Sequence, residues 1–358
     1  MIELIDYGFS DFFECQISEE DKKLGLIPAR VTCVQKESYQ LVSEMGENWG
    51  KLKGAHFYHD SGLCMYPAVG DFVLIKHNPI GEDIIYRVLE RISEFSRINP
   101  TSTHIPMATK QVVASNFDFV FIMTSLNHDF NIRKLERYVA TTLSSGATPV
   151  IVLTKADLCS NYKSHVTDIN MLLPEVDVRV ISAYTGFGMD KLKDYVQPAK
   201  TIVFLGSSGV GKSSLVNALA NDDLMKVNGI REEDSRGRHT TTFRQLFRLM
   251  NGTIVIDTPG MRELGLWDAS EGIKESFSDV EELTLQCRFH DCKHGKEPDC
   301  AIRAAIDEGV LSEKRFASYV KLLKETKYTE RKAAYLRAKS SASKRKVSKN
   351  KHGVINME

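Results

Sequence analysis

The chain has 358 residues, of which 42% are apolar and 26% are charged, and its formal net charge at pH 7 is zero. This length predicts two or three domains with real cores, and the zero charge gives no overall attraction to nucleic acid. No apolar run is long enough to span a membrane and the N-terminus lacks a basic signal-peptide start, so we expect a cytoplasmic protein. Seven cysteines, three of them clustered, fit a reducing compartment and a metal better than disulfides.

The N-terminal part of the chain predicts a small β-barrel behind a lead segment. Residues 1–29 are an N-terminal extension, and residues 30–95 alternate short β-type runs with turns. Small barrels bind RNA through exposed aromatic and basic side chains, although any single aromatic is more often part of the core. The candidates are Tyr39, Trp49, Lys51, Lys53, His56, Phe57 and Tyr58. Residues 96–114, with Pro100 and Pro106, indicate a linker.

A base-reading motif follows an apolar, strand-like run. Residues 149–153 are typical of a buried strand and lead directly into Thr154, Lys155, Ala156 and Asp157. The Asp157 carboxylate can accept hydrogen bonds from guanine N1–H and N2–H₂, a pair of donors that adenine does not offer. The Lys155 stem can lie over the base. Lys-x-Asp alone is too short to be specific, so its position after a strand is what supports a base reader.

Two details qualify this base reader. The common form of the motif begins with Asn, whose amide has two donor hydrogens, whereas Thr154 has a single hydroxyl. Guanine contact or loop bracing is then weaker, and selectivity for GTP is open. Ser182 and Ala183 come after another β-type run, and their backbone N–H groups can meet guanine O6.

A phosphate-binding loop occurs later in the chain, between a strand-like run at 201–205 and a helical pattern at 214–220. Glycines let its backbone N–H groups curl around phosphate oxygens, and the helix directs its positive end toward the same anion. Lys212 reaches the β- and γ-phosphates and Ser213 ligates Mg²⁺ in this interpretation. The loop residues are Gly206, Ser207, Ser208, Gly209, Val210, Gly211, Lys212, Ser213 and Ser214.

Two further segments complete the predicted phosphate site. Asp257 ends a strand-like run, where it can hold Mg²⁺ through water, and the Gly260 N–H is placed to sense the γ-phosphate. A polar stretch before them supplies Thr241 as a third Mg²⁺ ligand, with Thr242 a close second. Many GTPases orient the attacking water with a Gln at the position of Met261, so we expect slow turnover with His239 placing the water.

A cluster of thiols predicts a structural zinc site. Cys287, Cys292 and Cys300 lie within 14 residues and are joined by His294, with His290 a rival fourth ligand. Three thiolates and one imidazole make a closed tetrahedral set that leaves no position open for catalysis. Beyond them, residues 331–351 hold nine Lys or Arg and no Asp or Glu. This basic tail is either a solvated segment or a contact for RNA phosphates.

The base reader precedes the phosphate loop, whereas the usual GTPase has the opposite order. With that order the chain resembles the circularly permuted GTPases, and most closely the ribosome small-subunit-dependent GTPase (RsgA) family. The 68–71 segment, the 237–242 stretch and the cysteine cluster also match that family. The resemblance implies an OB-fold barrel, a GTPase domain at 115–272 and a helical zinc domain at 273–330, with His294 as the fourth ligand. Residues 331–358 remain as the basic tail.

The resemblance implies a monomeric GTPase that hydrolyses GTP to GDP, binds the 30S subunit and 16S rRNA, and acts late in subunit maturation. It implies one structural Zn²⁺, with Mg²⁺ accompanying GTP. Two other functions stay open on the residues alone: an RNA-binding scaffold with a structural nucleotide, and an ATP-dependent metabolic kinase. Lys155 and Asp157 argue against the kinase, because an enzyme that uses ATP does not need a motif that recognises guanine.

Overall fold

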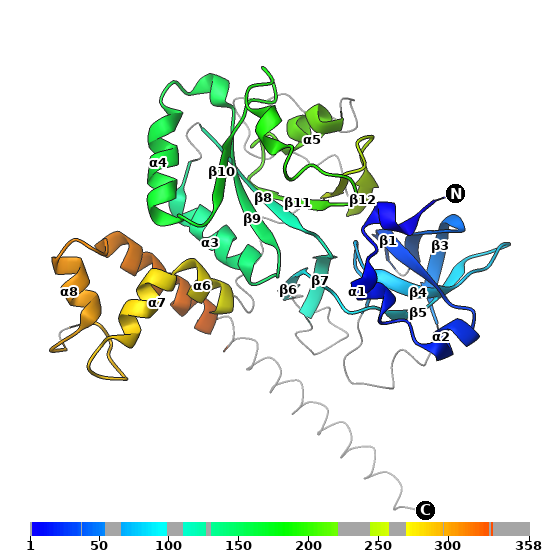
Figure 1. The fold of residues 1–358 in the computed structure, drawn as a ribbon, viewed down its shortest axis with the longest axis horizontal. Helices are drawn as coiled ribbons and strands as arrows, with labels where there is room; N and C mark the ends of the chain where they lie inside the picture. The colour runs from blue at the N-terminus through cyan, green and yellow to red at the C-terminus, as the bar shows by residue number, and fades with distance from the viewer. Residues whose placement is uncertain are drawn as a thin grey trace, which may run out of the picture. The chain divides into compact units, whose positions relative to one another are not determined.

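A computed structural model describes residues 2–36, 38–53, 66–98, 110–126, 130–220, 244–257, 270–295, 297–328 and 331. The chain forms two compact units (Figure 1). Unit 1 comprises Met1–Phe95 and Val112–Glu263, and unit 2 comprises Ser96–Gln111 and Leu264–Glu358. The proposed sites at Thr241, His239 and Gly260 lie outside the described residues.

Unit 1 begins with a lead segment that packs on the barrel. Its short helices bury Leu4 and Phe13 against Phe72, and the Phe13 and Phe72 rings are 4.3 Å apart between centroids. Ser18 and Asp21 form a reciprocal capping box that starts the last of these helices. The elements are η1 (Leu4–Tyr7), α1 (Asp11–Glu14) and α2 (Glu19–Lys23).

Five strands then close into the barrel that the alternating β-type runs predict. They pair in the order β1-β2-β3-β5-β4, and β4 pairs back to β1 so that the sheet closes on itself. Inward-facing side chains such as Val31, Leu41 and Ile85 are fully or nearly fully buried. The strands are β1 (Ile27–Gln35), β2 (Ser38–Ser43), β3 (Gly46–Leu52), β4 (Phe72–Lys76) and β5 (Asp83–Val88).

The second part of unit 1 is a mainly parallel sheet in the order β10-β9-β8-β11-β13, with β12 antiparallel at its edge. The carboxyl ends of parallel strands meet at one edge, so the last residues of β9, β11 and β13 lie at the same edge of the sheet. The strands are β8 (Phe119–Ser125), β9 (Thr148–Thr154), β10 (Asp177–Val180), β11 (Thr201–Gly206), β12 (Gln245–Arg248) and β13 (Ile254–Asp257).

Helices alternate with these strands. Helix α3 packs on β8 and β9, and α4 packs on β10. The Asn131 side chain caps α3 by accepting hydrogen bonds from two backbone N–H groups of its first turn. The helices are α3 (Ile132–Leu143), η3 (Ala156–Leu158), α4 (Tyr162–Leu172), η4 (Met189–Leu192) and α5 (Lys212–Ala220).

A buried polar junction joins the barrel to the parallel sheet. Strand β1 pairs with β12, so the barrel strands continue the mainly parallel sheet. The Asp71 carboxylate accepts hydrogen bonds from Ser115 Oγ at 2.6 Å and from two Arg91 nitrogens at 2.7 Å. A Cβ on Gly70 would lie 2.1 Å from the Ser115 carbonyl oxygen, so only glycine fits there. Gly70 and Asp71 of the 68–71 segment are therefore parts of this junction.

Strands β6 (Glu94–Ile98) and β7 (Lys110–Ser115) form a separate two-stranded sheet at the two ends of the predicted linker. The C-terminal part of unit 2 is helical, with α6 (Ser270–Ser276), α7 (Ser278–Leu285), α8 (Ala301–Asp307) and a further helix over residues 313–328. Phe277, Val280 and Ile302 are fully buried among them. Within the described part of the chain, no helix has the length and apolar character that a membrane span requires.

Candidate functional site

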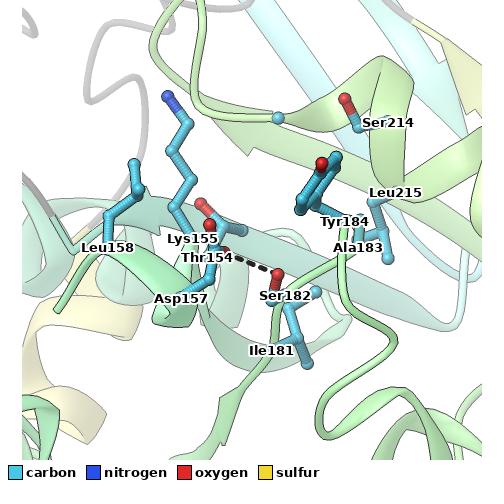
Figure 2. A pocket seen from close by; sticks show the side chains of 11 residues that line it. Thr154, Lys155, Asp157, Leu158, Ile181, Ser182, Ala183, Tyr184, Ser214 and Leu215 are labelled. Carbon is cyan, nitrogen blue, oxygen red and sulfur yellow. Dashed lines mark hydrogen bonds between the residues drawn. The ribbon is translucent and has the colours of Figure 1, made fainter. Parts of the chain in front are cut away.

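The base reader and the start of α5 share one pocket in unit 1. Figure 2 shows Lys155 and Asp157 on one side of it and Ser214 and Leu215 on the other. Its volume is about 200 Å³, which is below the roughly 300–1,000 Å³ of pockets that enclose drug-sized ligands. The pocket is therefore of a size for a single planar base. The lining residues are Thr154, Lys155, Asp157, Leu158, Ile181, Ser182, Ala183, Tyr184, Gly211, Ser214 and Leu215.

The Asp157 carboxylate is held in place by its neighbour across the pocket. Its Oδ1 accepts a hydrogen bond from Ser182 Oγ at 2.5 Å, drawn as a dashed line in Figure 2. Lys155 turns the chain between β9 and η3 with a left-handed φ of 58°, which a non-glycine residue rarely adopts. Such backbone strain is common at binding sites, where the surrounding structure enforces it. Because the Ser182 hydroxyl contacts only Oδ1, the Asp157 Oδ2 atom can accept hydrogen bonds from a ligand.

The two expected backbone donors after β10 behave differently. The Ser182 N–H donates to the Phe187 carbonyl at 2.9 Å, so it is already engaged within the protein. Within the described residues, the Ala183 N–H has no such partner and remains available for a ligand. Ser182 therefore serves this pocket through its hydroxyl, which orients Asp157, a role that the residue type alone did not reveal.

The phosphate loop has the predicted strand, loop and helix around it. It runs from β11 into α5, and Gly209 and Gly211 have left-handed φ values of 72° and 103°. The Lys212 ammonium lies across the loop and donates to the carbonyls of Gly206 at 2.9 Å and Ser207 at 2.8 Å. An ammonium above a glycine-rich turn at a helix start creates a positive site for phosphate oxygens.

Thr154 connects the two halves of the site. Its hydroxyl, on a side chain only 4% exposed, donates to the Val210 carbonyl in the phosphate loop at 2.6 Å. Its Oγ1 also lies 3.4 Å from the Thr124 carbonyl oxygen. The Thr154 hydroxyl therefore braces the phosphate loop, the role that an Asn amide could have at this position.

The residues proposed for Mg²⁺ fall partly within the described structure. Ser213 is half-buried in the first turn of α5, and Asp257 ends β13, whose neighbour β11 leads into the phosphate loop. A hydroxyl and a carboxylate are oxygen donors of the kind that a hard divalent cation prefers, so this pair fits Mg²⁺. Thr241, Thr242 and Gly260 are outside the described residues.

Unit 2 contains a cluster that could hold a metal ion. One ligand atom from each of Cys287, Cys292, His294 and Cys300 lies within 4.8 Å of every other. The Cys287 and Cys300 sulfurs are 4.0 Å apart and both lie close to His294 Nδ1, at 3.5 and 3.6 Å. A tetrahedral centre with Zn–S bonds of about 2.3 Å separates its sulfurs by roughly 3.8 Å, so the donors fit such a centre. His290 is not part of the cluster.

The surroundings of the cluster affect how its thiols ionise. Burial opposes ionisation of Cys287, but the backbone N–H groups of Ile302 and Ala301 at the start of α8 donate to it, and the net effect lowers its pKa. Burial raises the pKa of Cys292 to about 11. A bound cation would offset that cost, because thiolates are the metal-binding form.

The barrel candidates divide between core and surface. Tyr39 is 3% exposed and belongs to the barrel core, so it is not a surface contact for RNA. Trp49 is exposed, Lys51 pairs with Glu82, and the Lys53 ammonium lies 4.0 Å from the centre of the Tyr86 ring. His56, Phe57 and Tyr58 are outside the described residues.

Sequence reasoning missed Tyr184, whose side chain lines the pocket and is 92% exposed. Its position directly after Ala183 was the one signal that could have identified it. Leu158 was missed for a similar reason, because an exposed apolar residue after Asp157 has no distinctive pattern.

A parallel sheet whose base-reading strand precedes its phosphate-loop strand defines a circularly permuted phosphate-loop GTPase. The RsgA GTPase family model matches residues 88–267, and the chain belongs to that family. It is 43% identical over 344 residues to "Small ribosomal subunit biogenesis GTPase RsgA 2" of Listeria monocytogenes, covering 96% of this chain and 95% of that protein. A Lactiplantibacillus plantarum protein of the same name is 38% identical and covers 91% of this chain and 90% of its own length.

Two solved structures have a similar fold. YjeQ from Thermotoga maritima is 26% identical with a TM-score of 0.63, over 84% of this chain and 98% of that one. YloQ, described as a circularly permuted GTPase, is 25% identical with a TM-score of 0.58, over 85% of this chain and 96% of that one.

Proposed function

We propose that this protein binds GTP in the pocket of unit 1, hydrolyses it to GDP and phosphate, and assists maturation of the small ribosomal subunit. The observation that carries the proposal is the shared pocket, in which a fixed carboxylate and a glycine-rich loop follow the carboxyl ends of two parallel strands, β9 and β11, that lie on either side of β8. Relatives named as small-subunit biogenesis GTPases support the cellular role.

In this proposal Asp157 reads guanine N1–H and N2–H₂, the Ala183 N–H donates to guanine O6, and the Lys155 stem covers the base. Among the described residues, the second Asp157 oxygen and the Ala183 N–H have no hydrogen-bond partner, which supports these roles. Adenine lacks this pattern of donors, which makes the ATP-dependent kinase the weaker alternative.

Hydrolysis follows the usual course of phosphoryl transfer. Water attacks the γ-phosphorus in line, the bond to the bridging oxygen breaks, and GDP leaves as the water proton passes to the released phosphate. Lys212 and the loop N–H groups stabilise the charge that spreads over the phosphate oxygens. Ser213, Asp257 and Thr241 would hold Mg²⁺, which supplies further charge neutralisation when bound. We propose that His239 positions the water and that Gly260 contacts the γ-phosphate.

The cysteine cluster and the basic and exposed aromatic residues support a metal site and an RNA partner. We propose that Cys287, Cys292, His294 and Cys300 hold one Zn²⁺ with a structural role, because three thiolates and an imidazole leave no open position. We further propose that the protein acts as a monomer in the cytoplasm and contacts 16S rRNA of the 30S subunit. The exposed Trp49 and the basic segment 331–351 are its candidate RNA contacts.

The enzymatic part is tested by steady-state hydrolysis with GTP and with ATP as competing substrates. We expect GTP turnover that excess ATP does not inhibit, and loss of turnover by roughly 10²-fold or more in Lys212→Ala, the scale of losing one group that stabilises transition-state charge. Lys193→Ala, at an exposed position outside the lined pocket, is the matched control. Equal use of ATP would favour the kinase, and an absence of turnover under all conditions would favour the scaffold.

A further inference from the structure

The Thr154 hydroxyl has a single hydrogen, and its position decides what that hydrogen can do. The two acceptors close to Oγ1 are both backbone carbonyls, Val210 O at 2.6 Å and Thr124 O at 3.4 Å. A hydroxyl facing carbonyl oxygens must act as the donor, and the shorter distance assigns the hydrogen to Val210. Nothing is left for a ligand, because the side chain has no second hydrogen.

The backbone around Thr154 fixes this arrangement. Thr154 pairs with Ser125 at the end of β9, and its own carbonyl accepts a hydrogen bond from the Leu126 N–H at 3.0 Å. The side chain is β-branched and buried, so its rotamer is restricted. Val210 is also anchored, because its side chain is only 1% exposed and lies in the core cluster of the parallel sheet. The hydrogen bond therefore joins two fixed points.

The consequence lies in the peptide group that follows Val210. The described chain has no cis peptide bond, and in a trans peptide the C=O and N–H of one group point in opposite directions. Holding the Val210 carbonyl toward Thr154 therefore directs the Gly211 N–H away from it. Among the described residues this N–H has no hydrogen-bond partner, and Gly211 itself lines the pocket. An oriented, unpaired N–H in a glycine-rich loop is a phosphate donor.

We infer that Thr154 is a positioning residue for phosphate binding, not a base reader, and that the pocket does not read guanine N7 through the residue at this position. The inference rests on the proposed guanine site and deepens it. An Asn at this position could brace the loop with one amide hydrogen and still offer the other to the base, whereas Thr154 cannot. The base is then distinguished by its Watson–Crick edge, through Asp157 and Ala183.

The positioning role is tested with the full chain by measuring the dissociation constants of GDP and GMP for the unmodified protein, Thr154→Ser and Thr154→Val. Ser retains the hydroxyl, and Val keeps the shape without it. We expect the GDP-to-GMP affinity ratio to stay within about twofold in Thr154→Ser and to fall by about 2- to 10-fold in Thr154→Val, the effect of one neutral hydrogen bond. An unchanged ratio in Thr154→Val, or an equal loss for both nucleotides, would overturn the role.

The N7 part is tested with 7-deaza-GDP, in which a C–H replaces N7. We expect the unmodified protein to bind it as tightly as GDP within about twofold, and Thr154→Asn to bind it about 2- to 10-fold more weakly than GDP. A loss of more than about twofold in the unmodified protein contradicts the inference, and this comparison decides even if a variant fails to fold. If the unmodified protein bound no guanine nucleotide at all, the proposed function would fail first, which is a distinguishable result.

Discussion

At the scale of single residues, the pocket depends on a carboxylate whose freedom is limited by a hydroxyl. The Ser182 hydroxyl occupies one Asp157 oxygen at 2.5 Å, so the other is presented in a fixed direction. Residue types along the chain predict Asp157 as the reader. They do not predict which group of Ser182 contributes, because that depends on the Phe187 carbonyl taking the Ser182 N–H.

Replacing Asp157 with Asn should change the preferred base. The amide keeps the shape but offers a donor, which meets the O2 carbonyl of xanthine and no longer accepts two guanine hydrogens. We expect Asp157→Asn to lose GDP affinity by about 10- to 100-fold, the scale of hydrogen bonds to a charged group, and to prefer xanthosine diphosphate. Competition titrations measure this, with exposed Asp194→Asn as control. Retained preference for GDP would exclude Asp157 as the base reader.

At the scale of elements, the helices of unit 2 are organised around the cysteine cluster. Cys300 is the N-cap residue of α8, and the first N–H groups of that helix donate to Cys287. His294 packs its ring edge-on against Phe316 of the 313–328 helix, with 5.7 Å between centroids. A metal at the cluster would thus tie the start of α8 and the later helix into one core.

Removing the metal should therefore unfold the helices of unit 2 while nucleotide binding by unit 1 persists. Structural zinc contributes roughly 10 kcal/mol or more in zinc-finger peptides, which exceeds what so small a core supplies. We expect chelation, and Cys300→Ser, to abolish protection of α8 amides from hydrogen exchange, whereas exposed Cys15→Ser has no effect. Undiminished α8 protection in metal-free protein would show that the cluster is not a structural metal site.

The elements also show where sequence patterns stop being informative. Alternating apolar residues predict most barrel strands and the strands before Thr154 and Gly206, because local burial follows local sequence. The pairing of β1 with β12 joins segments more than 200 residues apart, and no local pattern encodes it. The same is true of the Asp71 junction, where Arg91 and Ser115 come from separate parts of the chain.

At the scale of the whole molecule, basic and acidic residues are unevenly distributed along a chain that is neutral in total. The formal net charge is zero, yet residues 331–351 contain nine basic and no acidic residues. A partner rich in phosphate would be attracted to that segment rather than to the chain as a whole. The inverted motif order still places the carboxyl ends of β9, β11 and β13 at one edge of the parallel sheet, which is where ligands of such sheets bind.

The central claim, that this protein is a GTPase serving the small ribosomal subunit, is tested most directly by GTP hydrolysis with and without purified small subunits. We expect slow turnover by the protein alone and an increase of about tenfold or more with small subunits, a modest value beside the roughly 10³–10⁵-fold that a partner-supplied arginine gives other GTPases. Large subunits at the same concentration are the control and should give no increase. Turnover that is the same with small subunits, large subunits or neither would contradict the claim.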